Sequence, residues 1–129
     1  MNKLILIRGV PGAGKSTKAK ELMFGNELWA RHIEADQYFI RPDGVYDWNP
    51  KFAKNAHEWC QNQAEEAMKS KYMVIVANTF VAKSTMQPYL DTAKKYGYEV
   101  EILIMDGGYK SIHDVPDYTV ARMRQQFEF

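Results

Sequence analysis

Three runs of apolar residues along the chain alternate with segments in which apolar residues recur every three or four positions. Runs rich in β-branched residues and leucine are typical of strands buried on both faces of a sheet, and we expect strands at 3–8, 72–77 and 100–105, with a short second strand at 32–35. The periodic segments predict helices at 15–24, 50–70, 86–96 and 118–127. Because strands that alternate with helices form βαβ units, the sequence predicts an α/β fold: a parallel sheet of four strands, or five, with helices on both faces.

Local signals place some of the helix ends more closely. Pro88 has no backbone donor, so it must lie in the first turn of its helix, and we expect Thr85 to be the N-cap. Gly97 is expected to end the same helix. An aromatic connector at 38–46 contains the turn signal Pro-Asp-Gly.

A glycine-rich segment follows the first predicted strand directly. Residues 9–17 read GVPGAGKST, which fits the pattern G-x-x-x-x-G-K-[ST]. Glycines let the backbone aim successive N–H groups at phosphate oxygens, and the helix that follows offers its positive N-terminus. Lys15 can reach the β- and γ-phosphates, and the hydroxyl of Ser16 is the expected Mg²⁺ ligand. The motif therefore predicts a P-loop NTPase fold that binds a nucleoside triphosphate. The expected binding residues are Gly9, Pro11, Gly12, Ala13, Gly14, Lys15, Ser16 and Thr17.

Two polar residues end predicted strands at the same edge of the sheet as this loop. Asp36 follows the second strand, where a carboxylate can accept a proton from an attacking hydroxyl or orient metal-bound water; alternatively, it caps the next helical turn. Asn78 follows the third strand, where Mg²⁺-holding NTPases often have an aspartate. Either Asp36 and water complete the metal shell with Ser16, or Asn78 contributes a neutral oxygen, or Asn78 only bonds loop backbone. The missing carboxylate argues against an ATPase motor and suits a kinase, in which the metal arrives on the nucleotide.

The segment at about 106–117 is a candidate lid over the phosphates. Gly107 and Gly108 permit a hinge, and Lys110 is a candidate for neutralising charge on the transferred phosphate. Arg122 on the last predicted helix is a second candidate for that task, although arginines on helices are commonly just solvated.

Composition and charge narrow the class of protein. A length of 129 residues suits one domain, 1–129. The 17 basic and 16 acidic residues give a net charge of +1, without the basic excess usual for a protein that tracks an extended polyanion. The single cysteine, Cys60, rules out an internal disulfide and fits a reducing compartment. The first apolar run is too short for a signal peptide or a membrane span, so we expect a cytoplasmic protein with no membrane partner.

These motifs resemble the phosphate-loop kinase branch that contains the 5′-kinase domain of phage polynucleotide kinase, together with short kinases of phages and eukaryotes. The landmarks are GVPGAGKST at 9–17, EAD at 34–36, DGVY at 43–46, AHEW at 56–59, VANT at 76–79, PY at 88–89 and SIHDVP at 111–116. The resemblance implies that Lys15 and Ser16 hold ATP and Mg²⁺, that Asp36 is the general base, and that basic lid residues clasp the phosphates. Related kinases carry arginines in the lid, where this chain has Tyr-Lys-Ser at 109–111.

The sequence thus predicts an ATP-dependent kinase. Asp36 would activate an acceptor hydroxyl, and Lys15, with Lys110 or Arg122, would offset charge in the transition state. The favoured acceptor, on resemblance rather than charge, is the 5′-hydroxyl of a nucleic acid or nucleotide. Near-neutral charge mildly favours the first alternative, a small-metabolite or nucleoside kinase. The absent strand carboxylate and the arginine-poor lid favour the second, an ATP-binding switch or interaction protein with little turnover.

Overall fold

Four parallel strands form a single sheet in the computed structural model, which describes residues 2–107 and 117–129. The strands are β1 Lys3–Arg8, β2 Ala30–Ile33, β3 Met73–Ala77 and β4 Glu99–Ile104. Their order across the sheet is β2-β3-β1-β4. The central strand β1 pairs with β3 and β4, and β3 also pairs with β2. This confirms the predicted parallel sheet, and within the described residues it has four strands. All four carboxyl ends meet at one edge.

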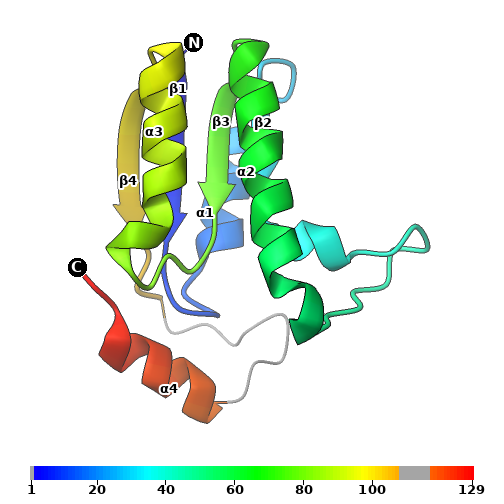
Figure 1. Ribbon diagram of the computed structural model, residues 1–129, viewed down its shortest axis with the longest axis vertical. Helices are drawn as coiled ribbons and strands as arrows, with labels where there is room; N and C mark the ends of the chain where they lie inside the picture. The colour runs from blue at the N-terminus through cyan, green and yellow to red at the C-terminus, as the bar shows by residue number, and fades with distance from the viewer. Residues whose placement is uncertain (1, 108–116) are drawn as a thin grey trace.

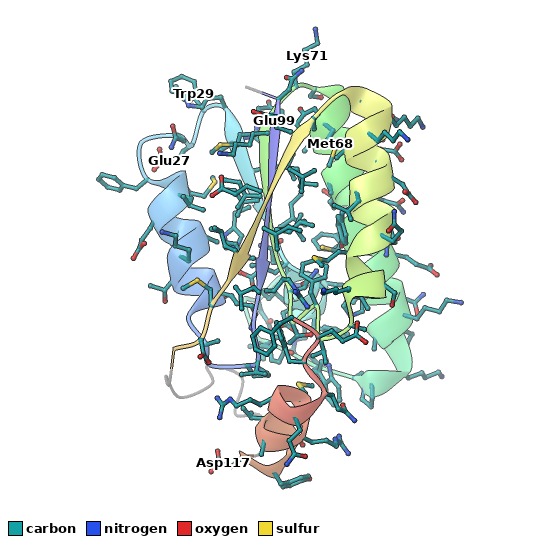
Figure 2. The ribbon with its side chains drawn as sticks, turned by 90° about the vertical axis from the view of Figure 1, so that its left-hand side faces the viewer. Glu27, Trp29, Met68, Lys71, Glu99 and Asp117 are labelled. Atoms are coloured by element: carbon teal, nitrogen blue, oxygen red, sulfur yellow. The ribbon has the colours of Figure 1, made fainter. Side chains whose placement is uncertain are left out.

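Helices cover both faces of this sheet (Figure 1). Helix α1, Lys15–Met23, lies on one face, whereas α2, Ala53–Lys69, and α3, Gln87–Tyr96, pack against the other. Figure 2 shows the sheet between these two layers. Successive strand residues point to opposite faces, so Leu4 and Leu6 join the core beneath α2 and α3, while Ile5 and Ile7 join the core beneath α1.

Helix α4, Asp117–Gln126, lies beyond the carboxyl edge of the sheet, outside the two layers (Figure 1). Three short 3-10 helices, η1 Ala35–Phe39, η2 Pro50–Phe52 and η3 Lys83–Met86, precede or connect the main elements. Of the helices in residues 2–107 and 117–129, none is both long and apolar enough to cross a membrane.

The predicted bounds of the second strand and the predicted N-cap at Thr85 are wrong. The second strand ends at Ile33 rather than at residue 35, because the chain turns into η1 at Ala35. Thr85 is not an N-cap: η3 has already begun at Lys83, and the Thr85 hydroxyl donates to the carbonyl oxygen of Ala82 at 2.5 Å. The constraint from Pro88 is nevertheless met, because this proline lies in the first turn of α3.

Candidate nucleotide-binding site

Residues 9–14 connect β1 to α1 at the carboxyl edge of the sheet. A Cβ at Gly9 would lie 2.7 Å from the backbone oxygen of Met105, so only glycine fits beside the end of β4. Gly14 immediately precedes α1 and has a φ of 99°, in the left-handed region that favours glycine. Among the described side chains, none caps the N-terminus of α1. The first N–H groups of this helix are therefore suited to an anion supplied by a ligand.

Lys15 reaches back across this loop. Its Nζ donates to the carbonyl oxygen of Val10 at 3.0 Å. Burial lowers the pKa of Lys15, and the nearby charges of Glu34 and Asp36 act in the opposite direction. A half-buried ammonium with acidic neighbours at the mouth of the loop is well placed to contact phosphate oxygens.

Glu34, the first residue after β2, was missed by the sequence reasoning. Its carboxylate oxygens lie 3.0 and 2.9 Å from Oγ of Ser16, and Oε2 lies 2.5 Å from Nε2 of His32. Burial by itself would raise the pKa of Glu34. Hydrogen bonds from His32 and Ser16, with the charge of Lys15, lower it overall. Glu34 is therefore a buried carboxylate held in its charged form. The available signal was an acidic residue at the end of a strand, two positions before Asp36.

Asp36 lies in η1, at the same edge of the sheet. Its Oδ1 accepts a hydrogen bond from the hydroxyl of Tyr46 at 3.0 Å. Burial and the charge of Asp36 raise the pKa of Tyr46, so the phenol keeps its proton and remains a donor. The aromatic connector thus orients this carboxylate.

Asn78 bonds loop backbone, one of the three predicted alternatives. Its Oδ1 accepts from the N–H of Ala35 at 2.9 Å, and its Nδ2 lies 3.6 Å from Sγ of Cys60. The buried amide therefore ties the end of β3 to the start of η1, between Glu34 and Asp36. A role for Asn78 as a metal ligand stays a prediction.

Of the two candidate cations near the lid, Arg122 is an exposed residue of α4. Lys110, like Gly108 and the rest of 108–116, lies outside the described residues.

Arg8 is a second buried charged residue beside the phosphate loop that the sequence reasoning missed. It is the last residue of β1, and its side chain is buried. The guanidinium donates to the carbonyl oxygens of Phe80 and Glu128, and it lies over the ring of Phe127. Arg8 therefore joins the start of the phosphate loop to the segment that follows α4.

A parallel β2-β3-β1-β4 sheet with a phosphate-loop motif between β1 and α1 defines a P-loop fold of the type found in kinases. A family model described as "AAA domain" matches residues 4–110, and the chain belongs to that family.

The chain is similar to two longer proteins. NEDD4-binding protein 2 of Homo sapiens is 32% identical over 135 residues, which cover 97% of this chain and 8% of that protein. The chain therefore spans only a small part of this relative. An uncharacterized protein of Pasteurella multocida (strain Pm70) is 25% identical over 135 residues, covering 95% of this chain and 75% of that protein.

Solved structures, kinases among them, share the fold. A sugar kinase from Janibacter sp. HTCC2649 has a TM-score of 0.66 at 14% identity, covering 100% of this chain and 79% of its own. A chain of the Pnkp1/Rnl/Hen1 RNA repair complex has a TM-score of 0.65 at 19% identity, and the match covers 98% of this chain and 39% of that one. The Mycobacterium tuberculosis APS kinase CysC, in complex with AMPPNP and APS, has a TM-score of 0.61 at 12% identity. The match covers 94% of this chain and 67% of that one. The predicted kinase-like P-loop fold is confirmed, whereas the phage branch stays a prediction.

Proposed function

We propose that this protein is an ATP-dependent kinase that transfers the γ-phosphoryl group to an acceptor hydroxyl. The observation that carries the proposal is that Lys15, at the start of α1, and Asp36, in η1 after β2, lie at the same carboxyl edge of the parallel sheet. Lys15 offsets the charge that develops on the transferred phosphoryl group. Asp36, oriented by Tyr46, accepts the proton of the attacking hydroxyl. Lys110 or Arg122 supplies a second cation in this proposal.

The residues at the loop also fit a magnesium ion. Mg²⁺ takes oxygen ligands and is commonly bound through one or two carboxylates together with substrate phosphates. Ser16 offers a hydroxyl beside the buried carboxylate of Glu34, and Asp36 was the carboxylate predicted from the sequence. Asn78 is less suited, because its Oδ1 already accepts a hydrogen bond from Ala35. When bound, the metal would neutralise charge on the phosphates of ATP.

The proposed acceptor is a 5′-hydroxyl of a nucleic acid or nucleotide. The sequence resemblance supports it, as does the fold shared with a chain of an RNA repair complex. Exposed aromatic side chains of the segment after β2, Tyr38 at 40% exposure and Trp48 at 55%, offer surfaces on which a nucleobase can stack. A small-metabolite kinase is the second candidate, favoured by the net charge of +1.

Transfer from γ-labelled ATP to a panel of acceptors tests the proposal. The panel holds 5′-hydroxyl oligonucleotides, nucleosides and sugars. We expect label on the oligonucleotide, and a loss of about 10²- to 10⁴-fold in Asp36→Asn with ATP binding retained. Asp91→Asn, an exposed site on α3, is the matched control and should transfer normally.

Three results would contradict parts of this proposal. Label on a sugar or free nucleoside alone would favour the small-metabolite kinase. ATP binding without transfer to any acceptor would favour the nucleotide-dependent switch. Undiminished transfer by Asp36→Asn would remove this residue from the mechanism.

A further inference from the structure

The carboxylate of Glu34 is buried and charged, and it has no part in the proton and phosphoryl transfer assigned above to Lys15 and Asp36. Its residue is 9% exposed, and both of its carboxylate oxygens contact Oγ of Ser16, at 3.0 and 2.9 Å. A hydroxyl carries one proton, so it donates fully to only one of these oxygens. The hydroxyl of Ser16 and the two carboxylate oxygens of Glu34 thus converge at the start of α1, which is the type of environment that a hard cation occupies.

The spacing of these oxygens also suits a magnesium ion. Mg²⁺ binds oxygen at about 2.0–2.1 Å with octahedral geometry, so neighbouring ligands lie about 2.8–3.0 Å apart. The Ser16 hydroxyl and either oxygen of Glu34 already have this separation. The hydroxyl of Ser16 would keep its proton and offer a lone pair to the metal, so the two side chains would need little movement.

The register of the sheet explains why this carboxylate comes from β2. Ile33 is paired with Val76, and Ile7 with Ala77, so Glu34 follows β2 at the level where Ala77 ends β3. NTPases that hold Mg²⁺ often have an aspartate at the end of β3. Here Ala77 is buried and Asn78 binds Ala35, so the carboxylate at this level is provided one strand further along the sheet.

His32 fixes the orientation of Glu34. An ionised carboxylate only accepts hydrogen bonds, so Nε2 of His32 is the donor in the 2.5 Å contact with Oε2. This bond holds Oε2 of Glu34 in place, while both carboxylate oxygens stay within 3.0 Å of Oγ of Ser16. Hydrogen bonds of this kind orient metal ligands, and their loss typically weakens metal binding about 10- to 100-fold.

We infer that Glu34 and Ser16 form the protein half of a divalent-cation site for Mg²⁺, with His32 as a positioning residue. In the described part of the chain, no three His, Cys, Asp or Glu side chains are grouped to hold a metal by themselves. The cation therefore binds together with a triphosphate, and each strengthens the binding of the other. The inference rests on the proposed function only in requiring that the loop binds ATP.

The test compares the affinity for a fluorescent ATP analogue in Mg²⁺ and in EDTA. In the wild type, Mg²⁺ should strengthen binding. We call the ratio of the affinity in Mg²⁺ to the affinity in EDTA the gain from Mg²⁺. In Glu34→Gln this gain should shrink at least tenfold, whereas the affinity in EDTA should stay equal or rise because a negative charge near the phosphates is gone. Glu58→Gln, an exposed glutamate on α2, is the control and should behave as the wild type. An undiminished gain in Glu34→Gln would overturn the inference.

A second variant covers the case in which Glu34→Gln does not fold, as judged by circular dichroism. His32→Gln keeps the carboxylate but changes its support, and the gain from Mg²⁺ should fall about tenfold or more. An unchanged gain would overturn the inference. The binding assay needs no acceptor, so the two proposals fail separately. Mg²⁺-dependent binding through Glu34 without transfer refutes only the kinase, whereas transfer with an undiminished Mg²⁺ gain in Glu34→Gln refutes only the metal site.

Discussion

Replacing Arg8 by methionine tests how the C-terminal segment is fixed beside the phosphate loop. Arg8 is 1% exposed, and its Nε and Nη2 donate to the carbonyl oxygen of Phe80 at 3.1 and 2.9 Å. Nη2 also donates to the carbonyl oxygen of Glu128 at 2.5 Å, and the guanidinium carbon lies 4.5 Å from the ring centroid of Phe127. Methionine retains most of the apolar stem but removes every one of these donors.

The expected loss follows from the two carbonyl oxygens that Arg8→Met leaves behind. A buried acceptor without a donor costs about 1–3 kcal/mol, which gives about 2–6 kcal/mol for Phe80 and Glu128 together. Two effects reduce this sum. Glu128 is exposed, so water can replace the lost donor, and burial lowers the pKa of Arg8, which shows that placing its charge here is itself costly. We therefore expect the free energy of unfolding to fall by about 2–4 kcal/mol.

Urea unfolding followed by circular dichroism measures this loss. Arg41→Met is the matched control, because Arg41 is exposed and paired only at the surface with Asp43; such pairs contribute about 0–1 kcal/mol. Limited proteolysis should also release the segment after α4 sooner in Arg8→Met than in the control. If the two variants unfold within about 0.5 kcal/mol of each other, the contacts of Arg8 do not stabilise the fold as argued.

Two further outcomes concern the phosphate loop itself. Gly9→Ala should lower the free energy of unfolding by about 1–3 kcal/mol and weaken ATP binding, because the new Cβ would lie 2.7 Å from the backbone oxygen of Met105; urea unfolding and calorimetry measure both. Lys15→Met should lose ATP binding in calorimetry without destabilising the nucleotide-free protein, because burial lowers the pKa of Lys15. Between that lowered pKa and the ordinary 10.5, the unfolded chain binds the Lys15 proton better, so the contribution of Lys15 to stability rises with pH. The free energy of unfolding of the wild type minus that of Lys15→Met should therefore increase over this range.

The fold could be predicted because its two central strands, β1 and β3, are buried on both faces. Every residue of Met73–Ala77 is buried, so the sequence there is a continuous apolar run, as expected for a central parallel strand. The second strand was placed two residues late, because its position depends on pairing with β3 rather than on local pattern. Its register places Glu34 beyond the strand, where the side chain meets Ser16.

Only the local part of the candidate site could be predicted. The phosphate loop is nine consecutive residues whose backbone requirements are written in the sequence. Glu34 contacts a residue 18 positions away, and Arg8 contacts one 120 positions away, so no local sequence motif predicts these contacts. In the sequence, an arginine after an apolar run indicates only that the strand ends there. The structure shows that its guanidinium donates to carbonyl oxygens of distant residues.

The anchoring of Ala35 has a consequence for how Glu34 and Asp36 divide their tasks. Glu34 is held by Ser16 and His32, Asp36 is held by Tyr46, and Asn78 fixes the N–H of the residue between them. The positions of both carboxylates therefore depend on the side-chain amide of Asn78. Asn78→Ala should weaken Mg²⁺-dependent ATP binding and phosphoryl transfer together. Glu34→Gln should weaken mainly the Mg²⁺-dependent binding of ATP, and Asp36→Asn mainly the phosphoryl transfer. Asn78→Asp keeps an oxygen that accepts from Ala35, so it should lose less of both than Asn78→Ala.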